Sequence, residues 1–154
     1  MSPTGTASDL LSEYDIVEDP EFFGSFDSAA QRAVLTVPQI IQAAWERNDA
    51  DMFARAFTAG GSLLMQQDQL TSSAEIRAYM ARGFQGGLRG ARVTGWPLNV
   101  TFLGEDVAVV VTQGGIILDG ESEIAPERAI RALWTIVAED ERWRLLCHHS
   151  TPLQ

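Results

Sequence analysis

The sequence predicts an α+β domain in which helices pack on one face of an antiparallel sheet. Two observations predict this class. Apolar residues recur at three- and four-residue steps from residue 27 to about residue 85, and they alternate with polar residues after Gly86-Gly87. The helices therefore precede the strands, an order typical of α+β folds rather than of alternating α/β folds. The length of 154 residues fits a single domain.

The first predicted helix begins at Asp27 or Ser28, because Ser28 and Gln31 have the spacing of a capping box. Pro38 interrupts the apolar pattern, so it should either kink this helix or start a second one. Asp49 is the expected N-cap of a further short helix. That helix is expected to run to Phe57 and to end before Gly60-Gly61.

Two short segments, 62–66 and 68–70, then predict a small hairpin. Ser72 and Glu75 form a second capping box, which opens a helix over residues 74–84. The remaining chain predicts long strands joined as a meander. Their expected ranges are 91–102, 107–118, 128–138 and 143–150.

The charge is concentrated at the N-terminus. Residues 1–27 carry seven acidic residues and no basic one, in a chain whose formal net charge is −10. We divide the chain into an acidic, partly disordered extension (1–26) and a folded domain (27–154). Residues 1–8 are small and polar and predict disorder. Residues 10–26 keep many large apolar side chains, so part of them should dock on the chain's own domain, on a second subunit or on a partner protein.

Composition excludes several classes of protein. The negative charge argues against nucleic acid and anionic membranes as partners. No run of 18 apolar residues could span a bilayer, and no secretory signal is visible. A single cysteine, Cys147, excludes an internal disulfide, so the expected location is the cytoplasm.

The two histidines of the chain are adjacent, at positions 148 and 149. If Asp140-Glu141 is a two-residue hairpin loop, counting outward places Trp134, Trp143 and His149 on the core face. His148 then faces outward. A loop one residue longer would reverse this assignment. The two side chains could enter one pocket only if a bulge intervened. Neighbouring histidines on a strand cannot chelate one metal ion, so we expect no metal site.

The same counting applies to the preceding hairpin. With Gly104-Glu105 as its loop, the core face ends in Trp96 beside Gln113. A glutamine on an apolar face needs a partner, a water or a ligand. We therefore expect a mostly apolar small-molecule cavity at the ends of the strands. Its expected lining is Trp96, Gln113, Trp134, Cys147 and His149.

The segments AAWERNDADMFARAFT, SSAEIRAYM and RWRLLCHHSTP resemble those of the nuclear transport factor 2-like superfamily, and within it the SnoaL-like SgcJ/EcaC group. The resemblance covers residues 27–152. It implies a cone, in which a strongly curved antiparallel or mixed sheet wraps around three N-terminal helices. It also implies a homodimer through the sheet, with which the apolar run at residues 107–111 agrees. Members of this group occur in enediyne polyketide biosynthesis, so the resemblance implies a polyketide intermediate as ligand.

The superfamily's enzymes use a carboxylate or histidine as general base, and the sequence offers His149 with Gln113 nearby as the candidate catalytic pair. No cofactor motif is present. The protein would be either a cofactor-independent isomerase or cyclase, or a carrier that shields a polyene; a third possibility is a regulator that contacts a biosynthetic partner enzyme through the acidic N-terminus. Asp68 is expected in a turn. The expected ligand contacts are Trp45, Trp96, Trp134, Tyr79 and Cys147.

Overall fold

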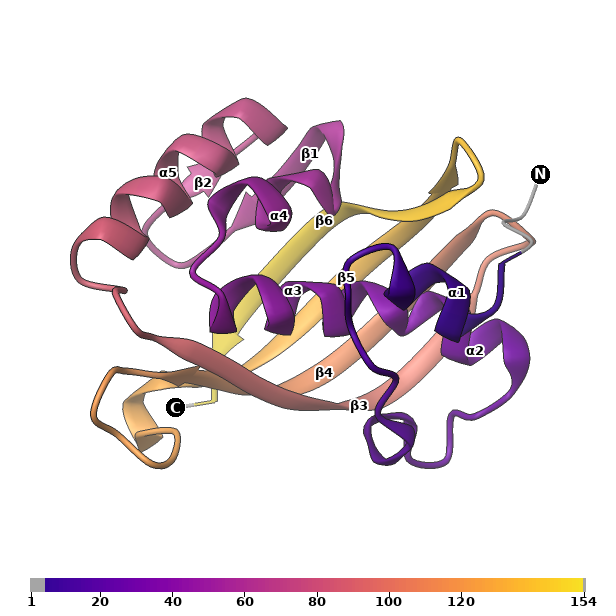
Figure 1. Cartoon of the computed structure of the whole chain (residues 1–154), viewed down its shortest axis with the longest axis horizontal. Coiled ribbons are helices and arrows are strands. Elements are labelled where there is room, and N and C mark those ends of the chain that lie inside the picture. The colour runs from indigo at the N-terminus through magenta and orange to yellow at the C-terminus, as the bar shows by residue number, and fades with distance from the viewer. Residues whose placement is uncertain (1–4, 154) are drawn as a thin grey trace.

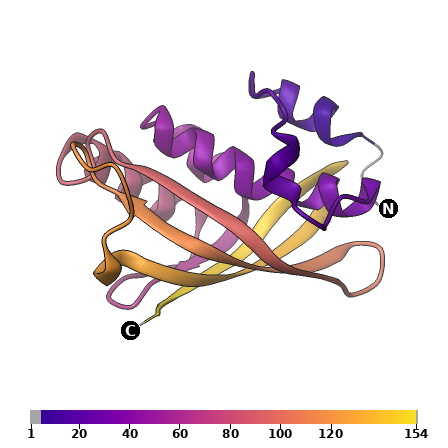
Figure 2. The same ribbon diagram turned by 90° about the horizontal axis from the view of Figure 1, so that it is seen from below.

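A computed structural model describes residues 5–153 and confirms the α+β class (Figure 1). One six-stranded mixed sheet, in the order β2-β1-β6-β5-β4-β3, curves around helix α3. Figure 2 shows the helices on the concave side of this sheet. The elements are α1 (Ala7–Ser12), η1 (Pro20–Phe23), α2 (Ala29–Val34), α3 (Thr36–Glu46), α4 (Ala50–Arg55), β1 (Phe57–Leu64), β2 (Gln69–Leu70), α5 (Ser73–Gln85), β3 (Arg92–Phe102), β4 (Val107–Ile117), η2 (Pro126–Arg128), β5 (Ala129–Glu139) and β6 (Arg142–Pro152).

The helix starts agree with the predicted caps. The Ser28 side chain accepts a hydrogen bond from the backbone of Gln31, and the capping box is complete. Pro38 lies in the first turn of α3, where no intrahelical N–H is required, so the chain starts a second helix instead of kinking the first. Asp49 caps α4 as predicted, but α4 ends at Arg55. The predicted end at Phe57 is wrong because that residue opens β1.

Strand β1 continues through Gly60-Gly61, which the sequence suggested as a break. It pairs with β2 as the predicted hairpin, with Leu63 opposite Leu70. It also pairs in parallel with β6, so that the sheet is mixed. This pairing joins residues about eighty positions apart in sequence, and no local pattern predicts it.

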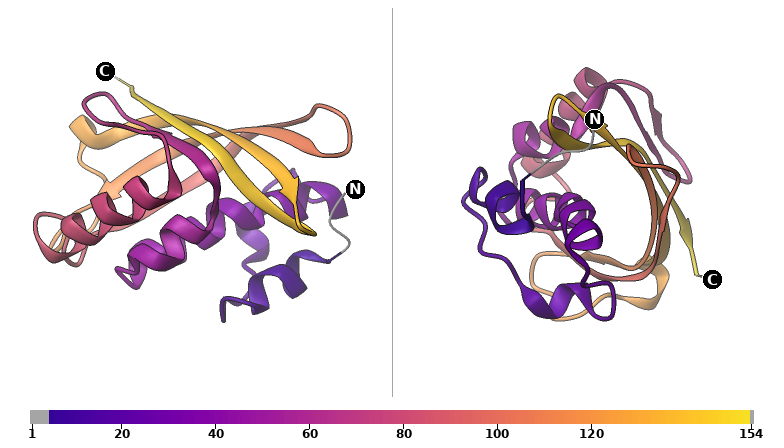
Figure 3. Two further views of the ribbon diagram at one scale, coloured as in Figure 1. Left: turned by 90° about the horizontal axis from the view of Figure 1, so that it is seen from above. Right: turned by 90° about the vertical axis from the view of Figure 1, so that its right-hand side faces the viewer.

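Strands β3 and β4 lie very close to each other at the pair Gly95 and Gly114. A Cβ atom on Gly114 would lie 2.1 Å from the carbonyl oxygen of Thr94. No side chain fits in that space, so only glycine allows the two strands to approach this closely. Figure 3 shows the curved sheet to which these two strands belong.

The C-terminal hairpin has the predicted two-residue loop. Asp140 and Glu141 both have positive φ angles, as a type I′ turn requires, and Glu139 pairs with Arg142. The register then shifts, because Thr135 pairs with Cys147 whereas Ile136 pairs with Leu145. Leu146 is the extra residue of a β-bulge.

This bulge reverses every side chain that follows it. Before it, Trp143 and Leu145 face the core as predicted. After it, His148 pairs with Trp134 on the inner face and His149 pairs with Leu133 on the outer face. The predicted placement of the two histidines is therefore wrong, because the loop has the predicted length but the strand contains a bulge that the counting did not include.

The β3–β4 hairpin also differs from its prediction. The N–H of Leu103 bonds to the carbonyl of Val107, so the loop has three residues instead of two. One extra loop residue exchanges the faces of β4. Val110 and Thr112 are buried in the core, and Gln113 faces outward.

The N-terminal segment docks on the chain's own domain, which was one of the three predicted possibilities. Leu11 and Phe23 are fully buried in the common core. The predicted disorder of residues 1–8 falls partly on residues 1–4, which lie outside the described residues. Ala7 and Ser8 belong to α1, whose first turn Thr6 caps. Within residues 5–153, no helix has the length and hydropathy needed to cross a bilayer.

Candidate functional site

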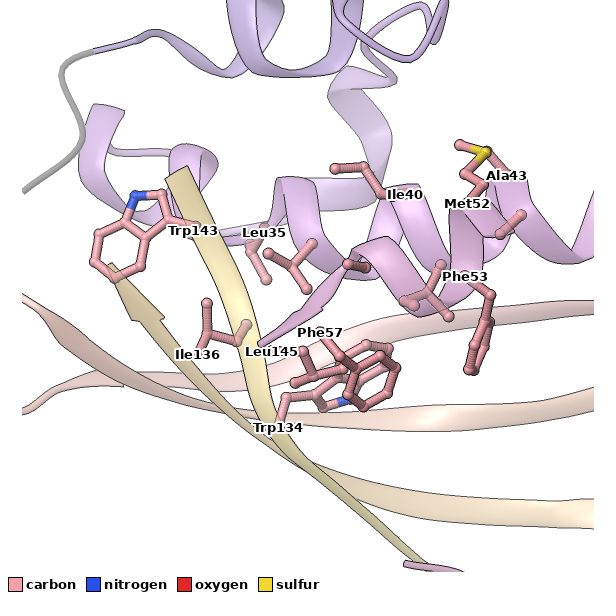
Figure 4. Packing of buried hydrophobic residues seen from close by; sticks show 14 of the residues in the cluster. Leu35, Ile40, Ala43, Met52, Phe53, Phe57, Trp134, Ile136, Trp143 and Leu145 are labelled. Atoms are coloured by element: carbon pink, nitrogen blue, oxygen red, sulfur yellow. The ribbon is translucent and has the colours of Figure 1, made fainter. Parts of the chain in front are cut away.

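A cavity of about 220 Å³ lies between helices α3 and α5 and the inner face of strands β3 to β6. Most of its lining is apolar. Trp45 anchors one wall from α3 and makes edge-to-face contacts with Phe53 and Phe84, at ring-centroid distances of 6.3 and 5.4 Å. Figure 4 shows Phe53, Phe57 and Trp134 packed below α3. The lining residues are Phe22, Pro38, Ile41, Gln42, Trp45, Phe53, Phe57, Leu63, Met65, Tyr79, Met80, Leu88, Val93, Thr94, Gly95, Thr112, Gly114, Gly115, Ile116, Ile130, Ala132, Trp134, Leu145, His148 and Ser150.

Among the described residues that line this cavity, His148 is the one histidine, and the lining contains no carboxylate. The His148 ring lies edge-on to Trp134, with 4.5 Å between the ring centroids and 84° between the planes. Its Nδ1 atom is buried and makes no hydrogen bond to residues 5–153. The pKa of His148 is lowered to about 4, mainly by burial, with a smaller contribution in the same direction from the neighbouring His149. The imidazole is therefore neutral at physiological pH.

Three of the other polar groups of the cavity already take part in hydrogen bonds. The indole N–H of Trp134 donates to Oγ1 of Thr112 over 2.8 Å. The hydroxyl of Tyr79 donates to Oδ2 of Asp68 over 3.0 Å. Burial, and then this hydrogen bond to a carboxylate, raise the pKa of Tyr79. Tyr79 thus remains a neutral phenol.

Asp68 itself lies in the β1–β2 turn, where its carbonyl accepts from the N–H of Met65 over 2.9 Å. This agrees with the predicted turn. Among the described residues, the side chains of Gln42, Thr94 and Ser150 line the cavity without a side-chain hydrogen bond to another protein group. Together with His148 they are the polar groups that a bound molecule could use.

The structure brings three of the predicted contact residues to this cavity: Trp45, Tyr79 and Trp134. Their roles in binding stay predictions. The predicted catalytic residue His149 is exposed on the outer face, beyond the Leu146 bulge. It cannot reach the cavity, so its neighbour His148 takes the position that the sequence assigned to it.

Gln113, Trp96 and Cys147 are also misplaced by the prediction. Gln113 faces outward because of the longer loop, and its Oε1 accepts from Arg131 over 2.8 Å. Trp96 pairs with Gln113 on the same outer face and is 48% exposed. Cys147 pairs with Thr135 and Ser62 away from the cavity, and burial raises the pKa of its thiol, which disfavours the thiolate nucleophile.

Sequence reasoning missed His148, Phe22 and Gln42 as cavity residues. Phe22 comes from the N-terminal extension, whose apolar residues indicated docking but not on which surface. Gln42 lies one residue after Ile41 on α3, so helical periodicity places it at the edge of the apolar face. No pattern in the sequence marked either of them as part of a site.

The part of the chain that the structure describes contains no cluster of three histidine, cysteine or acidic side chains able to hold a metal ion. The chemistry that these residues can support is therefore that of a neutral imidazole, an amide and hydroxyl groups in an apolar cavity.

Comparison with known proteins agrees with this architecture. The model of the SnoaL-like domain matches residues 34–154. The chain belongs to the SnoaL-like domain family. The match begins within α2, so that α1 and η1 precede it. A comparison with curated protein sequences found no significant match.

Solved structures resemble this SnoaL-like chain in fold. A domain of unknown function with a cystatin-like fold from Nostoc punctiforme has a TM-score of 0.76 at 22% identity, over 83% of this chain and 80% of that chain. An NTF2-like protein with a cystatin-like fold from Novosphingobium aromaticivorans has a TM-score of 0.69 at 15% identity, over 81% and 82%. A candidate scytalone dehydratase from the same organism has a TM-score of 0.69 at 15% identity, over 80% and 83%. At these identities the likeness shows the fold alone.

Proposed function

We propose that this SnoaL-like protein binds a flat, mostly apolar, unsaturated molecule that carries one or two oxygen atoms. The observation that carries the proposal is the composition of the cavity: aromatic and aliphatic walls around the neutral His148. An apolar pocket with a few convergent polar groups is the usual composition of a small-molecule site. The unengaged Gln42 and Ser150 supply two further partners for ligand oxygens.

The cavity volume limits the size of the ligand. An engineered apolar cavity of about 150 Å³ is known to bind benzene, and typical ligand pockets start near 300 Å³. A cavity of about 220 Å³ lies between these values. It therefore suits a molecule of about two fused rings, or a conjugated segment of similar length within a longer chain.

The site favours binding over turnover. The lining residues among those described include no carboxylate, so His148 is the candidate general base. A histidine of pKa about 4 is a base no stronger than an ordinary carboxylate. Protonating it would also create a cation inside an apolar cavity, which is unfavourable. We therefore propose a carrier or shielding protein as the principal function.

A proton-transfer isomerase or cyclase is the second candidate, and His148 is the observation that favours it. A buried, unpaired imidazole with a strongly shifted pKa is a common feature of catalytic sites. Catalysis would require a substrate oxygen or a bound water to stabilise the imidazolium as it forms.

We propose the class of ligand from the family relationship. SnoaL-like membership and the fold-level likeness to a candidate scytalone dehydratase support a polyketide or polyketide-derived aromatic as the ligand. The finer proposal, which rests on the sequence resemblance to the SgcJ/EcaC group, is an accessory role in enediyne biosynthesis with a polyene intermediate. A cytoplasmic location goes with that role.

The experiment mixes the purified protein with two probes, 2-naphthol and the polyene product of an enediyne polyketide synthase. Native mass spectrometry detects a complex, and liquid chromatography with mass spectrometry detects any change in the probe. A one-to-one complex with an unchanged probe supports the carrier. A new product formed in excess over the protein supports the enzyme instead.

The adjacent histidines provide matched variants for this experiment. His148→Phe should weaken binding of 2-naphthol, because the cavity loses its hydrogen-bonding ring nitrogen. His149→Phe makes the same change on the outer face and should leave binding unchanged. Absence of any complex with either probe, or equal effects of both variants, would contradict the proposed site.

A further inference from the structure

We propose that the N-terminal segment, residues 13–26, forms part of the ligand site and that Phe22 determines which ligands the site accepts. The inference rests on the proposed binding function and assigns a role to residues that precede the family match. Among the described residues, Phe22 is the one cavity-lining residue that comes before residue 34.

Phe22 separates two hollows. On one side it lines the main cavity together with Gln42. On the other side the same two residues line a smaller surface hollow of about 140 Å³ between the segment and α3. The remaining lining of that hollow is Ile16, Val17, Asp19, Gln39, Ala43 and Glu46. The Phe22 ring is thus a partition, and its removal would extend the main cavity toward the surface.

Phe23, the neighbour of Phe22, holds the Phe22 ring in place. Phe23 is 1% exposed, and its ring lies edge-on to that of Phe22, with 6.2 Å between the centroids. The guanidinium carbon of Arg32 lies 4.8 Å from the centroid of the Phe23 ring. Arg32 also forms an ion pair with Glu18, whose side chain is 15% exposed. A cation over a buried ring and a partly buried ion pair hold η1 on the domain.

A second arginine holds the chain upstream of η1. Arg47, just after α3, donates to the carbonyl oxygens of Tyr14 and Asp15 over 2.7 and 3.0 Å. Asp15 has a positive φ angle, so the chain makes a tight turn at this contact. Between the two arginine contacts, Pro20 opens η1 and Asp19 caps it. The position of Phe22 is therefore built into the fold.

Two properties of this arrangement indicate selection of ligands. The walls contributed by the sheet and by α3 belong to the core, whereas Phe22 is half-buried and stands on a four-residue 3₁₀ turn. Changes there alter the length of the site without disturbing the core. In an apolar pocket, one methylene group more or less changes the discrimination between two ligands by about tenfold or more. Removing the whole Phe22 ring should therefore have a large effect on which ligand is preferred.

The first experiment compares 2-naphthol with the longer 2-anthrol by isothermal titration calorimetry. The wild-type protein should prefer 2-naphthol. Phe22→Ala should shift the ratio of the two dissociation constants toward 2-anthrol by about tenfold or more. Leu103→Ala, which makes a comparable truncation outside the segment at a residue that is 59% exposed, is the control and should keep the wild-type ratio. An unchanged ratio in Phe22→Ala would overturn the inference.

The second experiment needs no ligand. Acrylamide quenching of tryptophan fluorescence is measured in a Trp96→Phe background, which removes the exposed indole. Phe22→Ala should increase quenching, because Trp45 and Trp134 line the opened cavity. Leu103→Ala should not. Equal quenching in both variants would overturn the inference.

The pair of experiments separates the two proposals. Increased quenching in Phe22→Ala without binding of either probe would support the role of Phe22 as a partition and would contradict the proposed binding function. Binding of 2-naphthol with unchanged selectivity and quenching in Phe22→Ala would retain the function and reject the partition.

Discussion

Replacing His148 should remove a pH dependence of stability that its burial creates. The pKa of His148 is about 4 in the folded protein, against about 6.5 in an unfolded chain. Between these values the unfolded state binds more protons than the folded state, so the free energy of unfolding falls as the pH is lowered. Applying this linkage to one site gives a loss of about 2 kcal/mol between pH 7 and pH 4.5.

The assay is urea unfolding of the wild type and of His148→Phe at pH 7 and at pH 4.5, followed by tryptophan fluorescence. Acidic residues contribute to the pH dependence of both proteins, so the quantity of interest is the difference between them. The wild type should lose about 2 kcal/mol more than the variant over this interval. Phenylalanine keeps an aromatic ring against Trp134, so the variant should still fold.

His149→Phe is the matched control, since the same change is made on the exposed outer face. It should retain the pH dependence of the wild type. If His148→Phe and the wild type lose the same free energy on acidification, His148 is not held neutral by burial, and the description of the cavity is wrong.

Three further predictions follow from single contacts. Gly114→Ala should lower the free energy of unfolding by about 3 kcal/mol or more, measured by thermal or urea unfolding, because the new Cβ would overlap a backbone carbonyl of β3. Gly60→Ala is the control; its new Cβ has open space, so its stability should be close to that of the wild type. Thr112→Val should lower the free energy of unfolding in urea by about 1–3 kcal/mol, because it leaves the indole N–H of Trp134 without a partner. An unchanged unfolding midpoint would contradict that hydrogen bond. We also propose that the outer sheet face, where Leu133 is 43% and Trp96 48% exposed, joins two copies of this chain. Light scattering should give twice 16.8 kDa for the wild type and the single-chain mass for Leu133→Arg, and a wild-type monomer would contradict the proposal.

The fold could be predicted because it depends on averaged patterns. A change of apolar period near residue 86 and the caps at Ser28, Asp49 and Ser72 all agree with the structure. Each of these signals involves neighbouring residues, so no knowledge of distant contacts is needed. The parallel pairing of β1 with β6 is the opposite case, because only the complete fold brings those strands together.

The site could be predicted only in composition. The expected apolar cavity exists, and residues on helices, such as Trp45 and Tyr79, were placed correctly. Trp134 was also placed correctly, but the predicted strand residues beyond a bulge or a longer loop were misplaced, because side-chain direction depends on counting and a single extra residue reverses it. The bulge at Leu146 exchanged His148 for His149, and the longer β3–β4 loop turned Gln113 outward.

The most direct test of the central claim uses the fact that the chain has only two histidines. A long-range ¹H–¹⁵N spectrum then shows two imidazoles, and His149→Phe assigns them. On titration with 2-naphthol, the account predicts that the resonances of His148 shift with saturation while those of His149 stay in place. Shifts of His149 alone, or complex formation without any change at His148, would contradict it.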